Sequence, residues 1–209
     1  MSPPAAADPG QPAESAVPDV PAHWAVDVVL ADGRPAHLRP LVPDDAPLYL
    51  GLLDGLSPES RYYRFFTPKP KLSEAEIEHF LNVDQHDRVA LVAVVEREMV
   101  GVARFDRNPD EPTVAELAVA VADEAQGTGV GTALLLHLTT AAHDRGVETL
   151  LANVLSDNHK MLRLLARNGR ELHRSFDGGI LAITFSTAPD AFVGVHVADV
   201  ADPGGGGPS

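Results

Sequence analysis

The sequence of 209 residues contains no cysteine. This absence excludes disulfides, thiolate metal sites and a covalent acyl-cysteine intermediate. It fits a reducing compartment, and we expect the protein in the cytoplasm. No apolar run approaches 18 residues, and the first residues lack a basic segment followed by an apolar one, so neither a membrane span nor a signal peptide is expected. The nine histidines show no spacing typical of metal ligands, and we expect no metal.

Lysine is scarce as well, with only Lys69, Lys71 and Lys160. Lysine and arginine together number 16 against 30 acidic residues, which gives a formal net charge of −14. Nucleic-acid partners require a basic face, so the charge argues against them. An acidic surface suits a basic acceptor, such as a protein lysine or a polyamine, but it also keeps a protein in solution. The composition does not separate these two interpretations.

Both ends of the chain are poor in large apolar side chains. Residues 1–22 are mostly Pro, Ala, Asp, Ser and Gly, and residues 187–209 contain four consecutive glycines. Such segments cannot bury enough apolar area to offset the entropy lost on folding, so we expect two largely disordered tails. Residues 23–186 are then expected to form one domain with a single core.

Between the tails, extended and helical patterns follow one another. The dipeptides Asp-Gly at 32–33 and Gly-Gly at 178–179 each lie between two extended runs and predict hairpins near both ends of the domain. Helix-start signals occur at Ser57 and at Ser73. The order of the runs predicts an α/β (α+β) fold, in which a mixed sheet of six or seven strands has helices on both faces.

The most informative segment is the glycine loop, residues 126–131, with the sequence Gln-Gly-Thr-Gly-Val-Gly. Its main-chain N–H groups can approach a ligand closely, and the helix that follows adds free N–H groups and the positive end of its dipole, so the loop predicts a site for a phosphate or pyrophosphate. A P-loop is excluded because no lysine lies between Lys71 and Lys160, and a dinucleotide fingerprint fails because its third small residue falls on Thr132. The remaining pattern, Q-x-x-G-x-G, resembles the acyl-CoA pyrophosphate loop of the GNAT N-acetyltransferase superfamily.

The strand that leads into this loop alternates with a period of two. Leu117, Val119 and Val121 are expected to face the core, while Glu116 lies on the other face with two alanines. A carboxylate next to methyl-sized residues leaves room for a ligand and can act as a general base toward an attacking amine. Main-chain N–H groups near Val119 and Val121 are the expected donors to the oxyanion that forms in such a reaction.

Three longer stretches resemble the Pat-type bacterial protein lysine acetyltransferases of this superfamily. Residues 115–131 are similar to the pattern AE-x-A-x-x-V-x-D…QG-x-G-[IVL]-G, residues 56–66 to the LSPES-x-Y-x-RFF helix, and residues 154–161 to the VL-x-x-N-x-x-M segment. The similarity extends over about residues 26–186. It implies direct transfer of an acetyl group from acetyl-CoA to a lysine, with Glu116 in the position of the catalytic glutamate.

From the residues and the resemblance together, we expect a set of contacts to acetyl-CoA. The set is Val119, Val121, Gln126, Gly127, Thr128, Gly129, Val130, Gly131, Thr132 and Asn158. Asn158 also suits the cap of a helix. Many superfamily members use a tyrosine near the last hairpin as general acid, but Tyr49, Tyr62 and Tyr63 lie elsewhere, which leaves water or His173 to protonate the leaving thiolate.

Two alternatives remain open from the sequence. The same fold can acetylate a small amine, or it can bind acyl-CoA as a regulatory module without turnover. The arginines of the second helix are also ambiguous. Arg61 and Arg64 can line the acceptor rim or meet the cofactor, or they can belong to a surface helix whose Tyr62, Phe65 and Phe66 pack inward.

Overall fold

The computed structural model describes residues 20–68, 71–168 and 171–189. The tails expected at 1–22 and 187–209 therefore lie mostly outside the described residues. Thr187, which we assigned to the second tail, is buried. Its hydroxyl donates to the Val147 carbonyl at 2.6 Å and its N–H donates to the Glu148 carbonyl at 3.0 Å, so the packed domain extends at least one residue further than expected.

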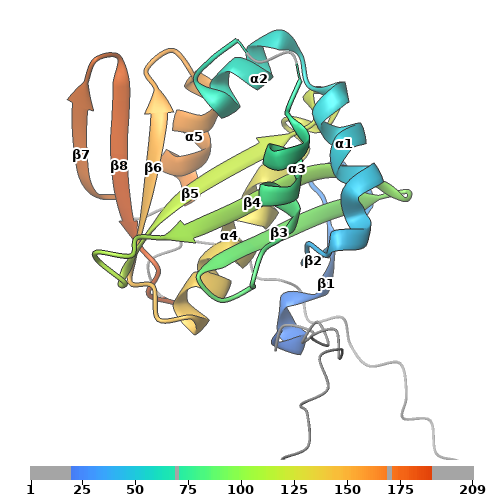
Figure 1. The fold of residues 1–209 in the computed structure, drawn as a ribbon, viewed down its shortest axis with the longest axis horizontal. Helices are drawn as coiled ribbons and strands as arrows, with labels where there is room; N and C mark the ends of the chain where they lie inside the picture. Colours follow the sequence, from blue (N-terminus) through green and yellow to red (C-terminus); the bar gives the residue numbers. More distant parts are fainter. Residues whose placement is uncertain (1–19, 69–70, 169–170, 190–209) are drawn as a thin grey trace, which may run out of the picture.

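A mixed sheet forms the centre of the molecule (Figure 1). Among the described residues it has eight strands in the order β1-β2-β3-β4-β5-β6-β8-β7, and β5–β6 is its one parallel pair. The strands are β1 (Val26–Val29), β2 (Pro35–Pro40), β3 (Arg88–Val95), β4 (Glu98–Arg107), β5 (Val114–Val121), β6 (Thr149–Leu155), β7 (Glu171–Asp177) and β8 (Ile180–Ser186). Both predicted hairpins, β1–β2 and β7–β8, join this one sheet, which is why it is larger than the six or seven strands expected.

Helices cover both faces of the sheet, as predicted. In the described ranges the α-helices are α1 (Ala46–Gly55), α2 (Pro58–Phe65), α3 (Glu74–Leu81), α4 (Val130–Asp144) and α5 (His159–Asn168). Figure 1 shows α1, α2 and α3 on one face and α4 on the other. Ser57 caps α2 and Ser73 caps α3, as their sequences predicted. None of the helices that the structure describes is long and apolar enough to cross a membrane.

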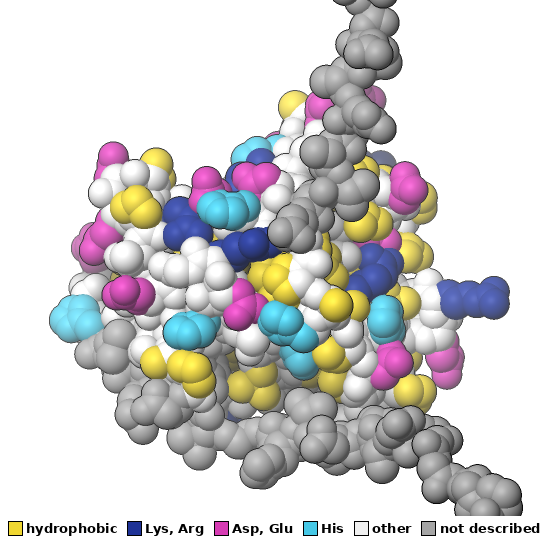
Figure 2. Space-filling view, turned by 90° about the horizontal axis from the view of Figure 1, so that it is seen from below, with side chains coloured by type: hydrophobic (Ala, Val, Ile, Leu, Met, Phe, Trp, Pro, Cys, Tyr) yellow, Lys and Arg dark blue, Asp and Glu magenta, His cyan; other side chains and the backbone are white. Residues whose placement is uncertain are grey.

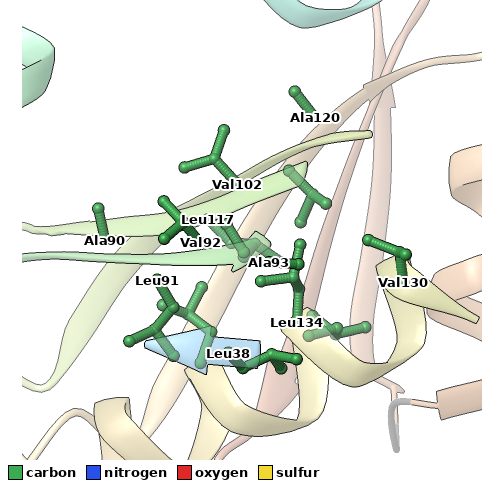
Figure 3. Packing of buried hydrophobic residues seen from close by; sticks show 14 of the residues in the cluster. Leu38, Ala90, Leu91, Val92, Ala93, Val102, Leu117, Ala120, Val130 and Leu134 are labelled. Carbon is green, nitrogen blue, oxygen red and sulfur yellow. The ribbon is translucent and has the colours of Figure 1, made fainter. Parts of the chain in front are cut away.

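The core between the sheet and α4 is tightly packed. Figure 3 shows Leu134 of α4 directed at the strands beside Leu117 and Leu38, all three of them buried. Gly101 on β4 allows this approach, because a Cβ there would lie 2.9 Å from side-chain atoms of both Leu134 and Val130. The first turn of α4 is therefore held close to the end of β5, where the glycine loop begins.

The parallel pair β5–β6 is short. Its register runs from Val114 opposite Thr149 to Leu117 opposite Ala152, whereas β5 continues to pair with β4 as far as Val121. The two strands therefore separate after Leu117 and Ala152, and we call this point the fork. Beyond the fork, the edge of β5 that faces β6 is released from the ladder, and a short 3-10 helix, η3 (Asp123–Ala125), then leads into the glycine loop.

Candidate active site

A cleft with a volume of about 650 Å³ lies between the fork, the glycine loop, α2 and α5. Gly127 and Gly129 have φ angles of +82° and +101°, in the left-handed region that glycine adopts without strain. Gly129 is also the N-cap residue of α4 and provides no side-chain cap, so the first N–H groups of that helix have no intrahelical or capping partner. These donors and the helix dipole make this end of the cleft suitable for a diphosphate.

The turn of the first hairpin braces the glycine loop. The Ala31 N–H donates to the Thr128 carbonyl at 2.8 Å, and a Cβ on Gly129 would lie 3.2 Å from the Ala31 nitrogen. On the other side, a Cβ on Gly131 would lie 3.3 Å from the Leu164 side chain of α5. The loop is thus enclosed between two elements that are distant from it in sequence.

Gln126 connects three elements at the loop end of the cleft. Its Nε2 donates to the Val121 carbonyl at 3.2 Å and to the Ser60 hydroxyl at 3.3 Å, and its Oε1 accepts from Lys160 Nζ at 2.6 Å. The first residue of the loop therefore holds β5, α2 and α5 in fixed relation.

Asp123 fixes the start of α2 against the end of β5. Its carboxylate accepts from the Ser57 N–H (2.9 Å), the Ser57 hydroxyl (2.9 Å) and the Ser60 hydroxyl (2.8 Å). Burial raises the pKa of Asp123, but these hydrogen bonds and the charge of Lys160 outweigh it and lower the pKa below its usual value. The ionised carboxylate is therefore the form that holds α2 over the cleft.

The helix α5 supplies basic side chains that the sequence analysis overlooked. Lys160, Arg163 and Arg167 all line the cleft. Their spacing, i, i+3 and i+7, places them on one face of the helix, and this pattern was the available signal. In a chain with a net charge of −14, this local concentration of cations next to the glycine loop favours a phosphate-bearing ligand.

Glu116 lies at the opposite end, beside the fork. It pairs across the β5–β6 ladder with Leu151, one position before the last pair, and its Oε1 accepts from Asn153 Nδ2 at 3.1 Å. The Glu116 side chain is exposed and is not among the residues that line the cleft. Val119, three residues further along β5, does line it, so Glu116 lies just beyond the lining residues, beside the fork.

The helix α2 lies over the cleft with Tyr63 and Arg64 facing it. Arg61 has a different role, because it donates to the Leu53 and Leu56 carbonyls and so closes the end of α1. The alternative in which Tyr62, Phe65 and Phe66 pack inward holds only for Phe65, which packs against the core, since Tyr62 and Phe66 are exposed. The hydrogen bonds to Asp123 orient α2 so that its Ser60–Arg64 side faces the cleft instead.

Most of the residues expected at the cofactor do line the cleft. They are Val119, Val121, Gln126, Gly127, Gly129, Gly131, Thr132 and Asn158. Thr128 and Val130 are not among the lining residues: the Thr128 hydroxyl donates to the Ala125 carbonyl at 2.7 Å, and Val130 is buried in the core, so any contact they make with a ligand is through the main chain.

Asn158 caps α5 through a bond from the Met161 N–H to its Oδ1. His173 is exposed on β7 and does not line the cleft. In the described part of the chain, no group of three or more acidic or histidine side chains is placed to hold a metal ion.

Comparison with known proteins agrees with this geometry. The sequence profile of the Acetyltransferase (GNAT) family matches residues 57–169. The chain is 32% identical over 146 residues to the acetyltransferase Pat of Mycolicibacterium smegmatis, covering 69% of this chain and 44% of that protein. It is 30% identical over 151 residues to an acetyltransferase of Pseudomonas aeruginosa, covering 70% of this chain and 80% of that protein.

Among solved structures, the GNAT domain of S. lividans PAT has 38% sequence identity and a TM-score of 0.76, and the match covers 80% of this chain and 99% of that one. The chain therefore spans less than half of the M. smegmatis Pat but matches nearly all of the solved GNAT domain of the S. lividans protein. Together with the profile match over more than half of its length, these similarities show that the chain belongs to the GNAT family of acetyltransferases, in its Pat-type branch.

Proposed function

We propose that this chain transfers the acetyl group of acetyl-CoA to a primary amine, with a protein lysine as the preferred acceptor, in the bacterial cytoplasm. The observation that carries the proposal is one continuous cleft with a diphosphate-type loop at one end and the fork at the other. In this arrangement the glycine loop and the first N–H groups of α4 hold the diphosphate. The acyl arm then follows the unpaired edge of β5 past Val121 and Val119 toward Glu116.

The proposed reaction needs a neutral amine. A lysine with the usual pKa of about 10.4 requires about 4.6 kcal/mol for deprotonation at pH 7, at about 1.36 kcal/mol per pH unit. We assign Glu116 as the base that takes this proton, directly or through one water, while the nitrogen attacks the thioester carbonyl. A main-chain N–H at Val119 or Val121 stabilises the oxyanion. As the carbon–sulfur bond breaks, the nitrogen loses its second proton and the leaving CoA thiolate takes up a proton through water, which gives the neutral amide and the free thiol.

Lysine as the acceptor is supported by the similarity to the Pat-type helix at residues 56–66, and by the acidic surface. A small amine as acceptor, or binding without turnover, uses the same cleft, and acceptor assays decide between these functions. The position of Glu116 and Asn153 beside the fork favours catalysis over simple binding, since neither residue is needed to hold the diphosphate.

The test is thiol release from acetyl-CoA over a panel of lysine peptides, polyamines and small amines, comparing the wild type with Glu116→Gln. Between about pH 7 and pH 9 we expect kcat to fall by about 100-fold or more in the variant, while the affinity for CoA stays close to that of the wild type. Glu98→Gln is the matched control, because Glu98 is exposed at the far end of β4. Unchanged kcat in Glu116→Gln would show that Glu116 is not the base. If the protein binds CoA but releases no thiol with any amine, the regulatory, non-catalytic function is the one that remains.

A further inference from the structure

Arg64 is the one cation of α2 that lines the cleft, and its guanidinium is in contact with no carboxylate among the described residues. No hydrogen bond or ion pair joins it to another residue that the structure describes. Its guanidinium carbon lies 5.1 Å from the centre of the Phe65 ring and 5.6 Å from that of Phe80. Aromatic faces attract a cation, but they do not neutralise it or satisfy its five N–H donors.

The charged groups around Arg64 do not satisfy it either. On the sheet beneath it, Arg104 bonds to Asp106 at 2.9 and 3.0 Å, and Arg88 bonds to the same carboxylate at 3.1 Å. Asp106 lies opposite Glu116 in the β4–β5 register. Arg88 and Arg104 therefore share the Asp106 carboxylate, while the Glu116 carboxylate accepts from Asn153.

Arg64 and Arg104 belong to the same group of side chains as Phe80, since Arg104 lies 5.0 Å from the Phe80 ring centre. This group lies on the α1–α3 face of the sheet, on the Glu116 side of the cleft, whereas Lys160 and Gln126 mark the phosphate end. A surplus positive charge is thus located where the acyl group and the amine meet, away from the diphosphate. Burial lowers the pKa of Arg64, as does the charge of Arg104, and Tyr49, Asp106 and Glu116 offset these effects only in part. A bound carboxylate would add the opposite charge that these groups do not fully supply.

We propose that Arg64 binds a carboxylate beside the reacting groups. The preferred acyl-CoA or the preferred amine acceptor then carries a carboxylate close to the amide bond that forms. This inference rests on the proposed acyl transfer. The carboxylate has two possible sources, which share one chemistry: the free end of a dicarboxylic acyl group such as succinyl, or an acidic residue next to the acceptor lysine. A guanidinium binds a carboxylate through two parallel hydrogen bonds, which gives geometric selectivity as well as charge.

The experiment compares kcat/KM for two matched pairs. In the first pair, acetyl-CoA and succinyl-CoA react with the same neutral amine; in the second, acetyl-CoA reacts with lysine peptides flanked by Asp or by Ala. We expect the wild type to prefer the carboxylate-bearing member of one pair by about tenfold or more. Arg64→Gln is expected to remove that preference and Arg64→Lys to keep part of it. The pair that responds identifies the source.

Arg163→Gln is the matched control, because Arg163 lines the phosphate end of the cleft and its loss should weaken all acyl-CoA reactions by a similar factor. The proposal is overturned if the wild type shows equal kcat/KM for the two members of each pair. It is also overturned if Arg64→Gln lowers kcat/KM by the same factor for every substrate. If either outcome is found and acetyl is still transferred to the neutral amine, the subsite proposal fails while the proposed acetyltransferase function stands. If no amine reacts, the proposed function has failed. The subsite is then tested by binding: calorimetric titration compares the affinities of the wild type and of Arg64→Gln for succinyl-CoA, acetyl-CoA and the two peptides.

Discussion

Single residues set the geometry of the phosphate end. Gly129 has a φ of +101°, which strains the backbone of any other residue. A Cβ at this position would also lie 3.2 Å from the main-chain nitrogen of Ala31, which cannot easily move. We expect Gly129→Val to lower the affinity for CoA by at least about tenfold, because the loop must shift away from Ala31. Isothermal titration with CoA measures this change.

Gly51→Ala is the control for that measurement. Gly51 lies within α1, and a Cβ there meets nothing within 4 Å. Alanine in a helix is favoured over glycine by about 0.5–1 kcal/mol, so this variant is expected to be slightly more stable and to bind CoA as the wild type does. Equal binding by Gly129→Val and the wild type would show that the loop does not hold the cofactor.

Asp45 gives the fold an acid-sensitive ion pair. Burial raises the pKa of Asp45, but hydrogen bonds from Arg39 and from the Val42 N–H lower it below its usual value. The folded chain therefore binds fewer protons than the unfolded chain just below pH 4, so this contribution is complete above about pH 4 and is lost as the pH falls through the folded-state pKa.

Asp45→Asn should cost about 2 kcal/mol of unfolding free energy at pH 7 and should flatten the decline of stability in acid, because Arg39 loses its charged partner. Urea unfolding at neutral and acid pH measures both effects. Asp27→Asn is the control, since within the described ranges Asp27 pairs only with His37 at the exposed edge of the sheet, and such pairs contribute about 0–1 kcal/mol. An identical response of the two variants would contradict a special role for Asp45.

At the scale of elements, α2 is held over the cleft by one carboxylate. Asp123→Asn replaces an ionic acceptor of three hydrogen bonds with a neutral amide, so we expect α2 to loosen and KM for acetyl-CoA to rise several-fold, with a smaller change in kcat. Glu124→Gln, at the exposed neighbouring position, is expected to leave both constants unchanged. A fall in kcat alone would instead place Asp123 in the chemical step.

The elements also show what the sequence could and could not predict. The caps at Ser57 and Ser73 and the glycine loop are encoded within a few residues, so local rules identify them. The contact of Ala31 with Thr128 and the bonds from Ser57 to Asp123 join segments that are far apart in the chain, and no local pattern reveals them. The exposure of Glu116 likewise depends on where β5 and β6 separate, which alternation along β5 alone does not show.

At the scale of the whole molecule, negative charge dominates, but acidic side chains do not cover the surface uniformly. Figure 2 shows acidic, basic and histidine side chains mixed on the face seen from below. The net charge of −14 nevertheless produces a field that attracts positively charged molecules over distances comparable to the screening length. Salt shortens that length from about 10 Å at 0.1 M to about 3 Å at 1 M.

We therefore expect kcat/KM for a net-basic lysine peptide to fall several-fold between about 0.1 M and about 1 M salt. A lysine peptide of zero net charge, assayed at the same acetyl-CoA concentration, should change much less and serves as the control. Parallel salt dependence of the two peptides would mean that the acidic surface does not guide the acceptor.

The bond from Ala31 to Thr128 has a practical consequence for dividing this protein into fragments. The family profile begins at residue 57, so a truncated protein that starts at this residue is an obvious choice. Such a fragment would discard the first hairpin and with it the support behind the diphosphate loop. A minimal folded unit must therefore start before the first hairpin, even though that hairpin lies outside the residues that the family profile matches.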